Sequence, residues 1–585
     1  MSYTTNSALL NLLVLLSPWS FASFVAEASS AAAANGVKSP FKIIFDGGST
    51  GSRLHIFEFL EADANGAQGS DRSNDDATTR LPASDTERDV QCVRRGSTRA
   101  NIPLSAFGRL PADQNNNNPL NSSKVAAHLL PLFDFAADII PSQYHETTGV
   151  YYQATAGMRL LAESEQEAVY DAVYEGLMAE ESFVFRGMQR KDIATLSGEM
   201  EAYYGALAAN FLKGIIDTEL HLVYAQNNGR ETNELPHHPI GALDMGGSST
   251  QIVYIANQDD EDDETERDPS NTCPIKQQPK LNDSENKNVC KLSDEHFFST
   301  SYLSYGVDQI RKRLWDTLVL EYVASDDAYM VPNPCANKGF EVEHKGHTLL
   351  GTGNTDECIR QMKRLIPHPD VLHDWDSDYS GWAVGGVEHP PIRGKFLAMS
   401  LYFFSLDSLR VFSEPDEEAH YALDEAWPTP SIDELQNALD GLCSRNWQGD
   451  MELQEGTHSF TRKEVLPHRC LETVYMVTLL KDGFGFHPSS RDITFTFLVD
   501  GDEVEWTLGL ALAMNANEKS STPPTTVTTT TTAYDYSIDD TNEDVKDDGC
   551  NETGNDVFEE EQQYHMQGMP NSQYFAVAMP PTHCC

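Results

Sequence analysis

The 585 residues of the chain exceed what one hydrophobic core fills, so the sequence predicts at least two lobes. The 90 acidic and 41 basic residues give a formal net charge of −49, which no basic patch could offset over much surface. This charge excludes nucleic acid and anionic lipid as expected partners, whereas a polyphosphate stays compatible if a divalent cation screens it.

The N-terminus is typical of a secretory signal peptide over residues 1–28. Residues 1–26 carry no charged side chain, residues 8–16 are mostly apolar, and an Ala-Glu-Ala cleavage signal follows. The alternative is an uncleaved N-terminal anchor, because the charge-free span is nearly long enough to cross a membrane. No other membrane contact is expected. Both interpretations place the protein in the secretory pathway, either secreted or in the Golgi or endoplasmic reticulum lumen.

A hairpin is predicted at residues 41–59, where two apolar runs flank the turn DGGSTGS. Such a turn alone most often marks a plain hairpin. Residues 242–255 repeat the layout, with Asp244, two glycines, two serines and a threonine between apolar runs. The repeat therefore predicts a duplicated half, with one loop in each lobe.

The composition of the two loops suits an anion. Glycines let backbone N–H groups approach a phosphate, and hydroxyl groups add further donors. Asp46 and Asp244 could each hold a water molecule of a metal ion. Facing loops of this type would clamp a polyphosphate between the two lobes.

Between the two hairpins the pattern predicts a helix over 124–140 and a strand over 150–152 that leads to Thr155. Thr155 is expected to be a helix N-cap. A further helix begins at Ser197 and carries an amphipathic apolar stripe. Glu199 and Glu201 lie off that stripe near the positive end of the helix. On this segment alone, two solvated carboxylates are the favoured interpretation.

Towards the C-terminus, residues 396–412 predict an apolar helix. Its Phe403 and Phe404 could be core residues or a platform for a nucleobase, and core is the better interpretation for either ring alone. Residues 503–512 predict a closing helix. The Thr-rich and then acidic segment 517–585 predicts a disordered tail.

Ten cysteines in a secreted chain predict disulfide bonds. Local spacing suggests the pairs Cys273–Cys290, Cys335–Cys358 and Cys443–Cys470. Cys92 has no obvious partner, and the other three cysteines lie in the tail. Asn121, Asn282 and Asn551 each begin an acceptor motif for glycosylation, so a glycoprotein is expected.

Five segments in chain order resemble the apyrase family, the nucleoside triphosphate diphosphohydrolases. They are DGGSTGSR (46–53), QATAGMRLL (153–161), LSGEMEAYYGALAANFL (196–212), LDMGGSSTQI (243–252) and EVEWTLGLAL (503–512). The resemblance spans residues 40–516. It implies an enzyme that hydrolyses nucleoside tri- or diphosphates to monophosphates.

The resemblance also implies an α/β actin-like fold of two ribonuclease-H-type lobes, with the nucleotide in the cleft between them. Residues 38–195 would form lobe I, with 490–516 returning to it, and residues 196–489 would form lobe II. The cofactor would be Ca²⁺ or Mg²⁺, which oxygen ligands without a Cys/His cluster also favour over zinc.

Residue roles follow motif by motif from the same resemblance. Glu201 would be the base that activates water, helped by Ser249 and Gln251. The residues around the hydrated metal would be Asp46, Thr155, Asp244 and Trp506. The residues that contact phosphate would be Gly48, Ser49, Thr50, Gly51, Ser52 and Arg53 in the first loop, and Gly246, Gly247, Ser248 and Ser249 in the second. Phe403 or Phe404 would stack on the base.

Several functions stay open at this stage. Within the resemblance, an apyrase and a nucleoside diphosphatase of the secretory pathway are not distinguished. A nucleotide-gated binding module is possible on the same fold, because Ala202 and Ala206 depart from the family pattern beside Glu201. An exopolyphosphatase-like enzyme would ignore the base. Base preference and oligomeric state do not follow from the sequence.

Overall fold

The computed structural model describes residues 38–61, 90–108, 120–223, 226–227, 230–231, 238–255, 290–323, 330–366, 382–413 and 423–520. Almost all of them belong to one compact unit, Met1–Glu518. The predicted signal peptide, the tail from 521 onward, Cys273, Asn282 and Asn551 lie outside the described residues. No described helix is both long enough and apolar enough to span a membrane.

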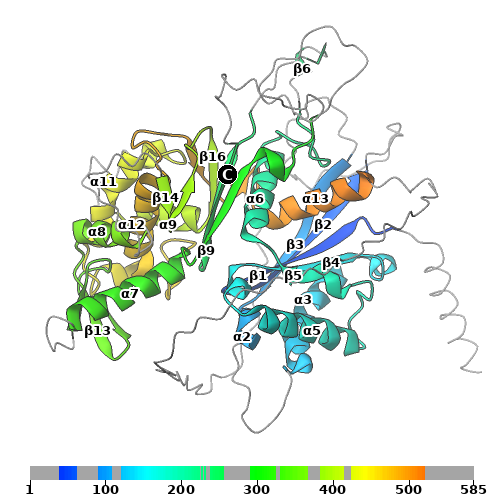
Figure 1. Ribbon diagram of the computed structural model, residues 1–585, viewed down its shortest axis with the longest axis horizontal. Helices are drawn as coiled ribbons and strands as arrows, with labels where there is room; N and C mark the ends of the chain where they lie inside the picture. The colour runs from blue at the N-terminus through cyan, green and yellow to red at the C-terminus, as the bar shows by residue number, and fades with distance from the viewer. Residues whose placement is uncertain are drawn as a thin grey trace, which may run out of the picture. The chain divides into compact units, whose positions relative to one another are not determined.

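The unit is built on two five-stranded sheets of the same topology (Figure 1). The first has the order β3-β2-β1-β4-β5, made of Phe41–Gly48 (β1), Gly51–Glu61 (β2), Val90–Ala100 (β3), Gly149–Ala154 (β4) and Ile193–Thr195 (β5). The second has the order β10-β9-β8-β16-β17, made of Gly241–Met245 (β8), Ser249–Tyr254 (β9), Phe298–Leu303 (β10), Phe396–Ser400 (β16) and Ile493–Phe495 (β17).

In each sheet the first three strands form an antiparallel meander and the last two run parallel to the first. Both hairpins that the sequence predicts are present, β1 with β2 and β8 with β9. The prediction of two ribonuclease-H-type lobes is confirmed.

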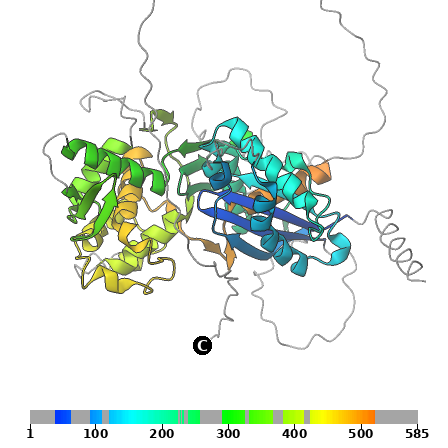
Figure 2. The same cartoon turned by 90° about the horizontal axis from the view of Figure 1, so that it is seen from below.

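The first sheet lies between two hydrophobic cores, so β1 is buried on both faces. Ile43 packs with α3 (Ser122–Ile139) and α5 (Glu163–Ala179), whereas Ile44 faces the opposite core. Alternate residues of a strand point to opposite faces, so a continuous apolar run is expected here. Figure 2 shows the blue strands of this sheet beside the cyan helices that cover it.

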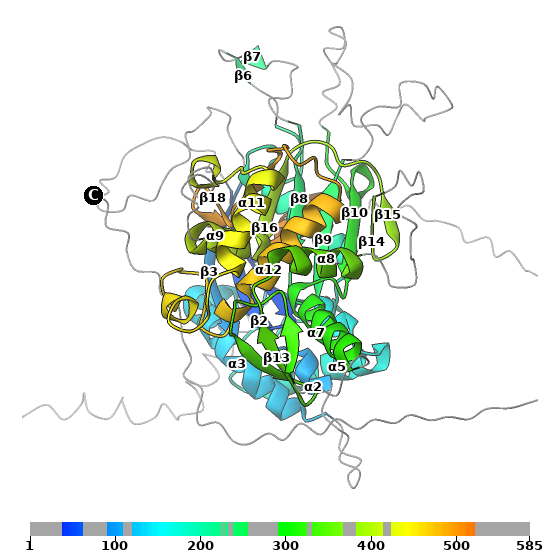
Figure 3. The ribbon, with the colours of Figure 1, turned by 90° about the vertical axis from the view of Figure 1, so that its left-hand side faces the viewer.

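The second sheet is covered on one face by five helices (Figure 3). They are α7 (Val307–Val323), α8 (Thr355–Leu365), α9 (Leu401–Phe412), α11 (Ile432–Cys443) and α12 (Arg469–Thr478). Leu243, Ile252 and Ala398 of the sheet join this core.

Helices α6 (Gly198–Leu212) and α13 (Trp506–Ser520) share a third core that includes side chains of both sheets. Ile44 enters it from the first sheet, and Leu397 enters it from the second. The two helices approach closely at Gly509, where a Cβ would overlap the backbone of Tyr204. Position 509 therefore requires glycine, and Figure 1 shows α13 beside β2 and β3.

The other elements are short. They include α2 (Ser105–Gly108), α4 (Ala156–Arg159), β6 (Gln226–Asn227), β7 (Arg230–Glu231), β11 (Met330–Asn333), β12 (Glu341–His344), β13 (His347–Gly351), β14 (Trp382–Val384), β15 (Val387–His389), β18 (Leu498–Val499) and β19 (Asp502–Glu503).

The structure corrects three boundaries. Residues 396–400 are strand β16 and not helix, because an apolar run buried on both faces carries no helical period. The closing helix begins at Trp506, since Asp502–Glu503 pairs as a strand. Strand β17, which we expected to return to lobe I, pairs with β16 in the second sheet.

Two predicted disulfide bonds are confirmed, Cys335–Cys358 and Cys443–Cys470. Both lie in the lobe of the second sheet and tie α8, α11 and α12 to their surroundings. Cys290 is also disulfide-bonded, and its predicted partner Cys273 lies outside the described residues. Cys92 is a free thiol, as its spacing indicated.

Candidate active site

The first loop is the tip of the β1–β2 hairpin, where Gly48 pairs with Gly51 and Ser49 and Thr50 form the turn. A Cβ at position 51 would overlap the carbonyl of Ala100, so only glycine fits there. Within the described residues, no group accepts a hydrogen bond from the backbone N–H of Ser49 or Thr50. The turn therefore presents free donors.

Arg99 on β3 and Ser52 on β2 flank this turn. Arg99 donates through Nη2 to Thr50 Oγ1 at 2.8 Å and to the Thr50 carbonyl at 3.2 Å. Ser52, expected at a phosphate, is fully buried instead, and its hydroxyl lies 2.7 Å from the hydroxyl of Tyr152. Because residues of a strand alternate between faces, Ser52 points into the core while Arg53 does not.

The second loop is held by the start of α7. The carbonyl groups of Gly246, Gly247 and Ser248 accept hydrogen bonds from the N–H groups of Val307 (3.1 Å), Asp308 (2.9 Å) and Ser304 (2.8 Å). In the described part of the chain nothing accepts from the N–H groups of Gly247 and Ser248. The carbonyl groups of this loop are thus bonded within the protein, whereas two of its N–H groups stay available to bind an anion.

The tips of the two loops lie against one another. A Cβ on Gly247 would lie 2.9 Å from Ser49 Oγ, and a Cβ on Gly157 of α4 would lie 2.9 Å from Ser49 Cα. Ser49 is therefore held between α4 and the second loop. The two turns that carry free N–H groups therefore meet at Ser49.

Three carboxylates lie behind the loops, on Asp46, Glu201 and Asp244. Withdrawal from solvent raises the pKa of Asp46 to about 6, against the lowering effect of Arg53. It also raises the pKa of Asp244 to about 6, although a hydrogen bond from Ser400 opposes the rise. Asp46 Oδ1 is buried and has no hydrogen-bond partner among the described residues. The negative charge of the three carboxylates is therefore not fully balanced by the positive side chains around them.

Glu201 lies in the first turns of α6, whose N-cap is Ser197 as predicted. Its neighbour Glu199 is exposed, but Glu201 is only 8% exposed, so the solvated interpretation fails for this residue. Burial raises the pKa of Glu201 to about 8, and the charges of Asp244 and Asp46 add to that rise while Arg159 opposes it. A carboxyl with this pKa can accept a proton near neutral pH.

Side chains from two directions hold Glu201. Arg159 at the end of α4 forms an ion pair with Glu201 Oε2. Gln251 Nε2 donates to the same oxygen at 3.1 Å, to Ser249 Oγ at 2.7 Å and to Ser301 Oγ at 3.0 Å. All of these contacts to Glu201 end on Oε2. The geometry leaves Oε1 as the oxygen for a water molecule.

The other two residues expected around a metal are Thr155 and Trp506. The Thr155 N–H donates to the carbonyl of Gly47, which follows Asp46, at 3.1 Å, and Trp506 follows Glu505, whose charge acts on Asp46. Thr155 is the N-cap residue of α4, but its side chain makes no capping hydrogen bond. Trp506, the first residue of α13, is buried in the core shared with α6. No described group of three or more His, Cys, Asp or Glu side chains is placed to hold a metal directly.

The sequence interpretation missed Arg159, Ser301 and Glu505. Glu505 forms an ion pair with Arg53, and its Oε2 lies 2.9 Å from Nε2 of the buried His55. Burial opposes ionisation of Glu505, but His55 and Arg53 outweigh it and hold its pKa below the ordinary value. Arg159 and Glu505 stand inside two of the quoted motifs, so their segments were available as a signal.

Phe403 and Phe404 belong to an aromatic group in the second lobe, with Phe460, Phe497 and Trp427. Phe403 is buried, which agrees with the core interpretation for this ring. Phe404 is only partly buried and lies 5.1 Å from Phe460, measured between ring centroids. Phe404 is therefore the more available ring for stacking.

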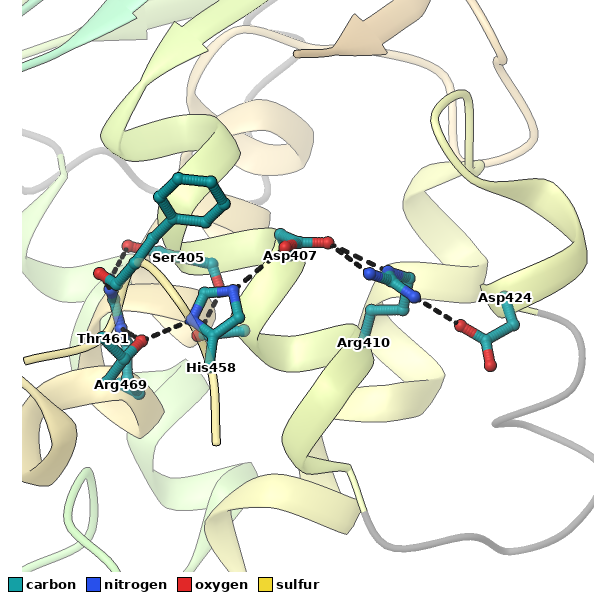
Figure 4. A network of polar contacts seen from close by, with 9 residues as sticks. Ser405, Asp407, Arg410, Asp424, His458, Thr461 and Arg469 are labelled. Carbon is teal, nitrogen blue, oxygen red and sulfur yellow. Dashed lines mark hydrogen bonds and ion pairs between the residues drawn. The ribbon is translucent and has the colours of Figure 1, made fainter. Parts of the chain in front are cut away.

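A buried polar network supports this aromatic group (Figure 4). Arg469 donates to Thr461 Oγ1 at 2.9 Å, to Glu472 Oε2 at 2.7 Å and to the carbonyl of Phe460 at 2.9 Å. Figure 4 shows the chain of contacts continuing through His458 and Asp407 to Arg410. The network fixes the segment that carries Phe460 onto α9 and α12.

Residues 33–525 match the family described as GDA1/CD39 (nucleoside phosphatase). The Golgi apyrase of Saccharomyces cerevisiae is 24% identical over 497 residues, which cover 81% of this chain and 70% of that protein. The guanosine-diphosphatase of Schizosaccharomyces pombe is 22% identical over 501 residues, covering 82% and 74%. Ectonucleoside triphosphate diphosphohydrolase 1 of Mus musculus is 27% identical over 418 residues, covering 67% and 70%.

Among solved structures, that of nucleoside triphosphate hydrolases from Neospora caninum is similar with a TM-score of 0.51. The two chains are 12% identical, and the match covers 86% of this chain and 98% of the other. At this identity the match speaks for the fold alone.

Proposed function

The chain belongs to the GDA1/CD39 family of nucleoside phosphatases and is an enzyme of the actin-like fold; from this premise we propose that Glu201 activates the water that hydrolyses the terminal phosphoanhydride bond of a nucleoside tri- or diphosphate. The observation that carries the proposal is the position of Glu201, buried between Arg159 and Gln251 and beside two loops with free N–H donors.

Hydrolysis of a phosphoanhydride needs an in-line water and stabilisation of charge on the transferred phosphoryl group. Glu201 accepts the proton of the attacking water as the new P–O bond forms, a role worth about 10²- to 10⁴-fold in rate. Ser249 and Gln251 orient that water. The bond from phosphorus to the bridging oxygen breaks, and the nucleotide leaves with one phosphate fewer.

The two loops stabilise the charge that develops on the phosphoryl oxygens. The N–H groups of Ser49, Thr50, Gly247 and Ser248 are fixed in place before substrate binds, so no reorganisation is needed during the reaction. Arg53 adds a positive charge next to the first loop. Phe404 offers a ring for the base.

The carboxylates fit a hydrated Ca²⁺ or Mg²⁺ ion. Asp46 Oδ1 is buried without a partner, and hard cations prefer oxygen donors of this kind. Asp46 and Asp244, with the Thr155 hydroxyl and the face of Trp506, would hold the ion through its water shell. When bound, the ion screens the phosphate charge.

We place the protein in the lumen of the secretory pathway. The relatives from yeast include a Golgi apyrase and a guanosine-diphosphatase, which supports that compartment and keeps two substrate ranges open. Residues 38–195 would form lobe I together with the C-terminal segment after β17, and residues 196–489 together with β17 would form lobe II, because β17 pairs with β16 in the second sheet.

The test is phosphate release from ATP, ADP, GDP, UDP and inorganic polyphosphate, with Ca²⁺, Mg²⁺ or a chelator. We expect chelator-sensitive turnover of nucleotides but not of polyphosphate. Turnover of both ATP and ADP identifies an apyrase range, and turnover of diphosphates alone identifies a diphosphatase.

The decisive variant is Glu201→Gln, with Glu199→Gln as a matched control. Glu199 lies two positions earlier on the same helix but is exposed. Glu201→Gln should lose turnover and keep nucleotide binding, while Glu199→Gln keeps both. A Glu201→Gln protein at full rate would refute the role of Glu201. Binding without turnover by the natural protein would favour a nucleotide-gated module.

A further inference from the structure

Ser301 on β10 stands at the junction of the residues that hold Glu201. In the antiparallel register β10 places Ser301 directly opposite Gln251, which itself is opposite Asp244 on β8. Side chains directly opposite one another share a face and interact. Ser301 therefore continues the row of active-site residues onto a third strand.

The Ser301 hydroxyl oxygen accepts two hydrogen bonds. One comes from Gln251 Nε2 at 3.0 Å, and the other from Arg159 Nη1 at 3.1 Å. These two donors are the same side chains that contact Glu201 Oε2. Ser301 thus contacts both partners of Glu201, and within the described residues it makes no hydrogen bond to Glu201 itself.

Arg159 depends on Ser301 for its orientation. Its Nη2 pairs with Glu201 and its Nη1 with Ser301, whereas its Nε is buried with no partner among the described residues. A planar guanidinium is fixed when two of its nitrogens are bonded and can swing when one is. Loss of the hydroxyl would leave Arg159 with a single anchor.

Helix α6 packs tightly against Ser301. A Cβ on Gly198, the first residue of α6, would lie 2.5 Å from Ser301 Oγ. Glycine at 198 therefore lets the helix that carries Glu201 seat directly on β10. The position of the hydroxyl is fixed relative to that helix.

The contact also joins the two halves of the protein. Arg159 follows β4 of the first sheet, and Ser301 belongs to the second sheet. The orientation of Glu201 consequently requires α4 and β10 to be in contact.

From this geometry we propose that Ser301 is a positioning residue, which holds Arg159 and Gln251 so that Glu201 presents its free oxygen to the attacking water. The inference rests on the proposed role of Glu201. It assigns Ser301 no contact with substrate.

The test compares Ser301→Ala with Ser299→Ala. Ser299 lies two residues earlier on the same strand face, and its hydroxyl is buried without a partner in the described structure. Each variant removes one hydroxyl from β10, but only Ser301→Ala removes hydrogen bonds.

We expect Ser301→Ala to lower kcat by about 10- to 100-fold with KM changed less than about threefold, because misplacement of a catalytic group costs rate more than binding. Ser299→Ala should keep kcat. Equal kcat values for the two variants, or a loss in Ser301→Ala that falls on KM alone, would overturn the proposal.

A double-mutant cycle separates this inference from the proposed function. Ser301→Ala and Arg159→Lys should be coupled in urea unfolding, since the two side chains are in contact. Coupling in unfolding together with additive effects on kcat would show a structural bond only and overturn the positioning role. If the natural protein hydrolyses no nucleotide, the proposed function fails, and absence of coupling in unfolding would then refute the Ser301–Arg159 link as well.

Discussion

Arg53 of the first hairpin forms an ion pair with Glu505, which is 452 positions away in the sequence and directly precedes helix α13. Glu505 also contacts the buried His55. The strand that follows the first loop is thereby tied to the C-terminal segment that supplies Trp506.

Glu505→Gln should weaken both stability and nucleotide binding. Loss of a charge-assisted contact in a partly buried position costs about 1 to 3 kcal/mol of unfolding free energy at pH 7. Because the folded pKa of Glu505 is held below its ordinary value of 4.5, this contribution is present above that value and is lost as the pH falls below it. Urea unfolding at pH 7 and at pH 3.5 measures the difference, which should shrink at the lower pH.

The control for this variant is Glu503→Gln. Glu503 pairs with Arg94 at 2.7 Å, and its charge acts on Arg53 less strongly than that of Glu505, which contacts Arg53 directly. Its loss should leave the KM for nucleotide unchanged. An equal rise in KM for both variants would mean that Glu505 acts on overall folding and not on Arg53.

The pKa of Glu201 sets the pH dependence. A base must be deprotonated to act, and burial raises the pKa of Glu201 above its ordinary value of 4.5, so kcat/KM should rise with pH along a limb that lies above pH 4.5 and then level off. This rise of kcat/KM with pH should be absent from the residual activity of Glu201→Gln. A limb near pH 4.5 in the natural protein would contradict the burial effect.

The same shift predicts a stability change of opposite sense. A carboxyl with a raised folded pKa binds its proton more tightly in the folded state, so unfolding free energy falls as the pH rises from 4.5 towards 8. Glu201→Gln has no such proton to lose. In metal-free thermal unfolding, the stability of Glu201→Gln relative to the natural protein should increase between pH 5 and pH 9. If the two proteins lost stability in parallel over this range, the prediction would be refuted.

The two hairpins could be predicted from sequence because each is local: an apolar run, a glycine-rich turn and a second apolar run within 20 residues fix the pairing. The parallel strand β16 could not, since residues 396–400 are buried on both faces and have no period of two. Its apolar run continues into α9 without a polar break.

The support of Glu201 was also beyond the sequence. An acid in the first turn of a helix looks solvated when only its own helix is considered. Its burial arises from Arg159 and Gln251, which lie 42 and 50 positions away, and from the placement of α6 between two sheets. Ser301 joins the group only through the register of β10 with β9.

Gly247→Ala should disturb the contact between the two loops. The added methyl would lie 2.5 Å from Asp308 Oδ2 and 2.9 Å from Ser49 Oγ, so the side chains of Asp308 and Ser49 must move. We expect a rise in KM for nucleotide with little change in unfolding, since these contacts are with side chains near the surface. Initial rates over a range of substrate concentrations measure the effect.

Gly205→Ala is the matched control for a glycine change. Gly205 lies inside α6, where a Cβ would make only an ordinary contact of 3.7 Å with Met399. Alanine should therefore stabilise the protein by about 0.5 to 1 kcal/mol through helix propensity, without a change in KM. A rise in KM in this variant would show that small changes in α6 also reach the site.

The network around Arg469 predicts a large effect on stability. Arg469 and Glu472 are almost fully buried, and their ion pair has a 2.7 Å contact. Arg469→Met leaves the Glu472 carboxylate buried with only the Ser405 hydroxyl to bond it, which should cost about 3 to 5 kcal/mol of unfolding free energy. Adding Glu472→Gln should recover part of that loss, because the uncompensated charge is removed.

Lys463→Met is the control from the same lobe, since Lys463 pairs with Glu455 at 3.3 Å on an exposed surface. Exposed pairs contribute about 0 to 1 kcal/mol, so this variant should unfold at nearly the natural urea concentration. If Arg469→Met also unfolded at nearly the urea concentration of the natural protein, the buried network would contribute no net stability. It would then not support the segment that carries Phe460. A rise in KM without a loss of stability would instead assign Arg469 to the nucleobase side of the site.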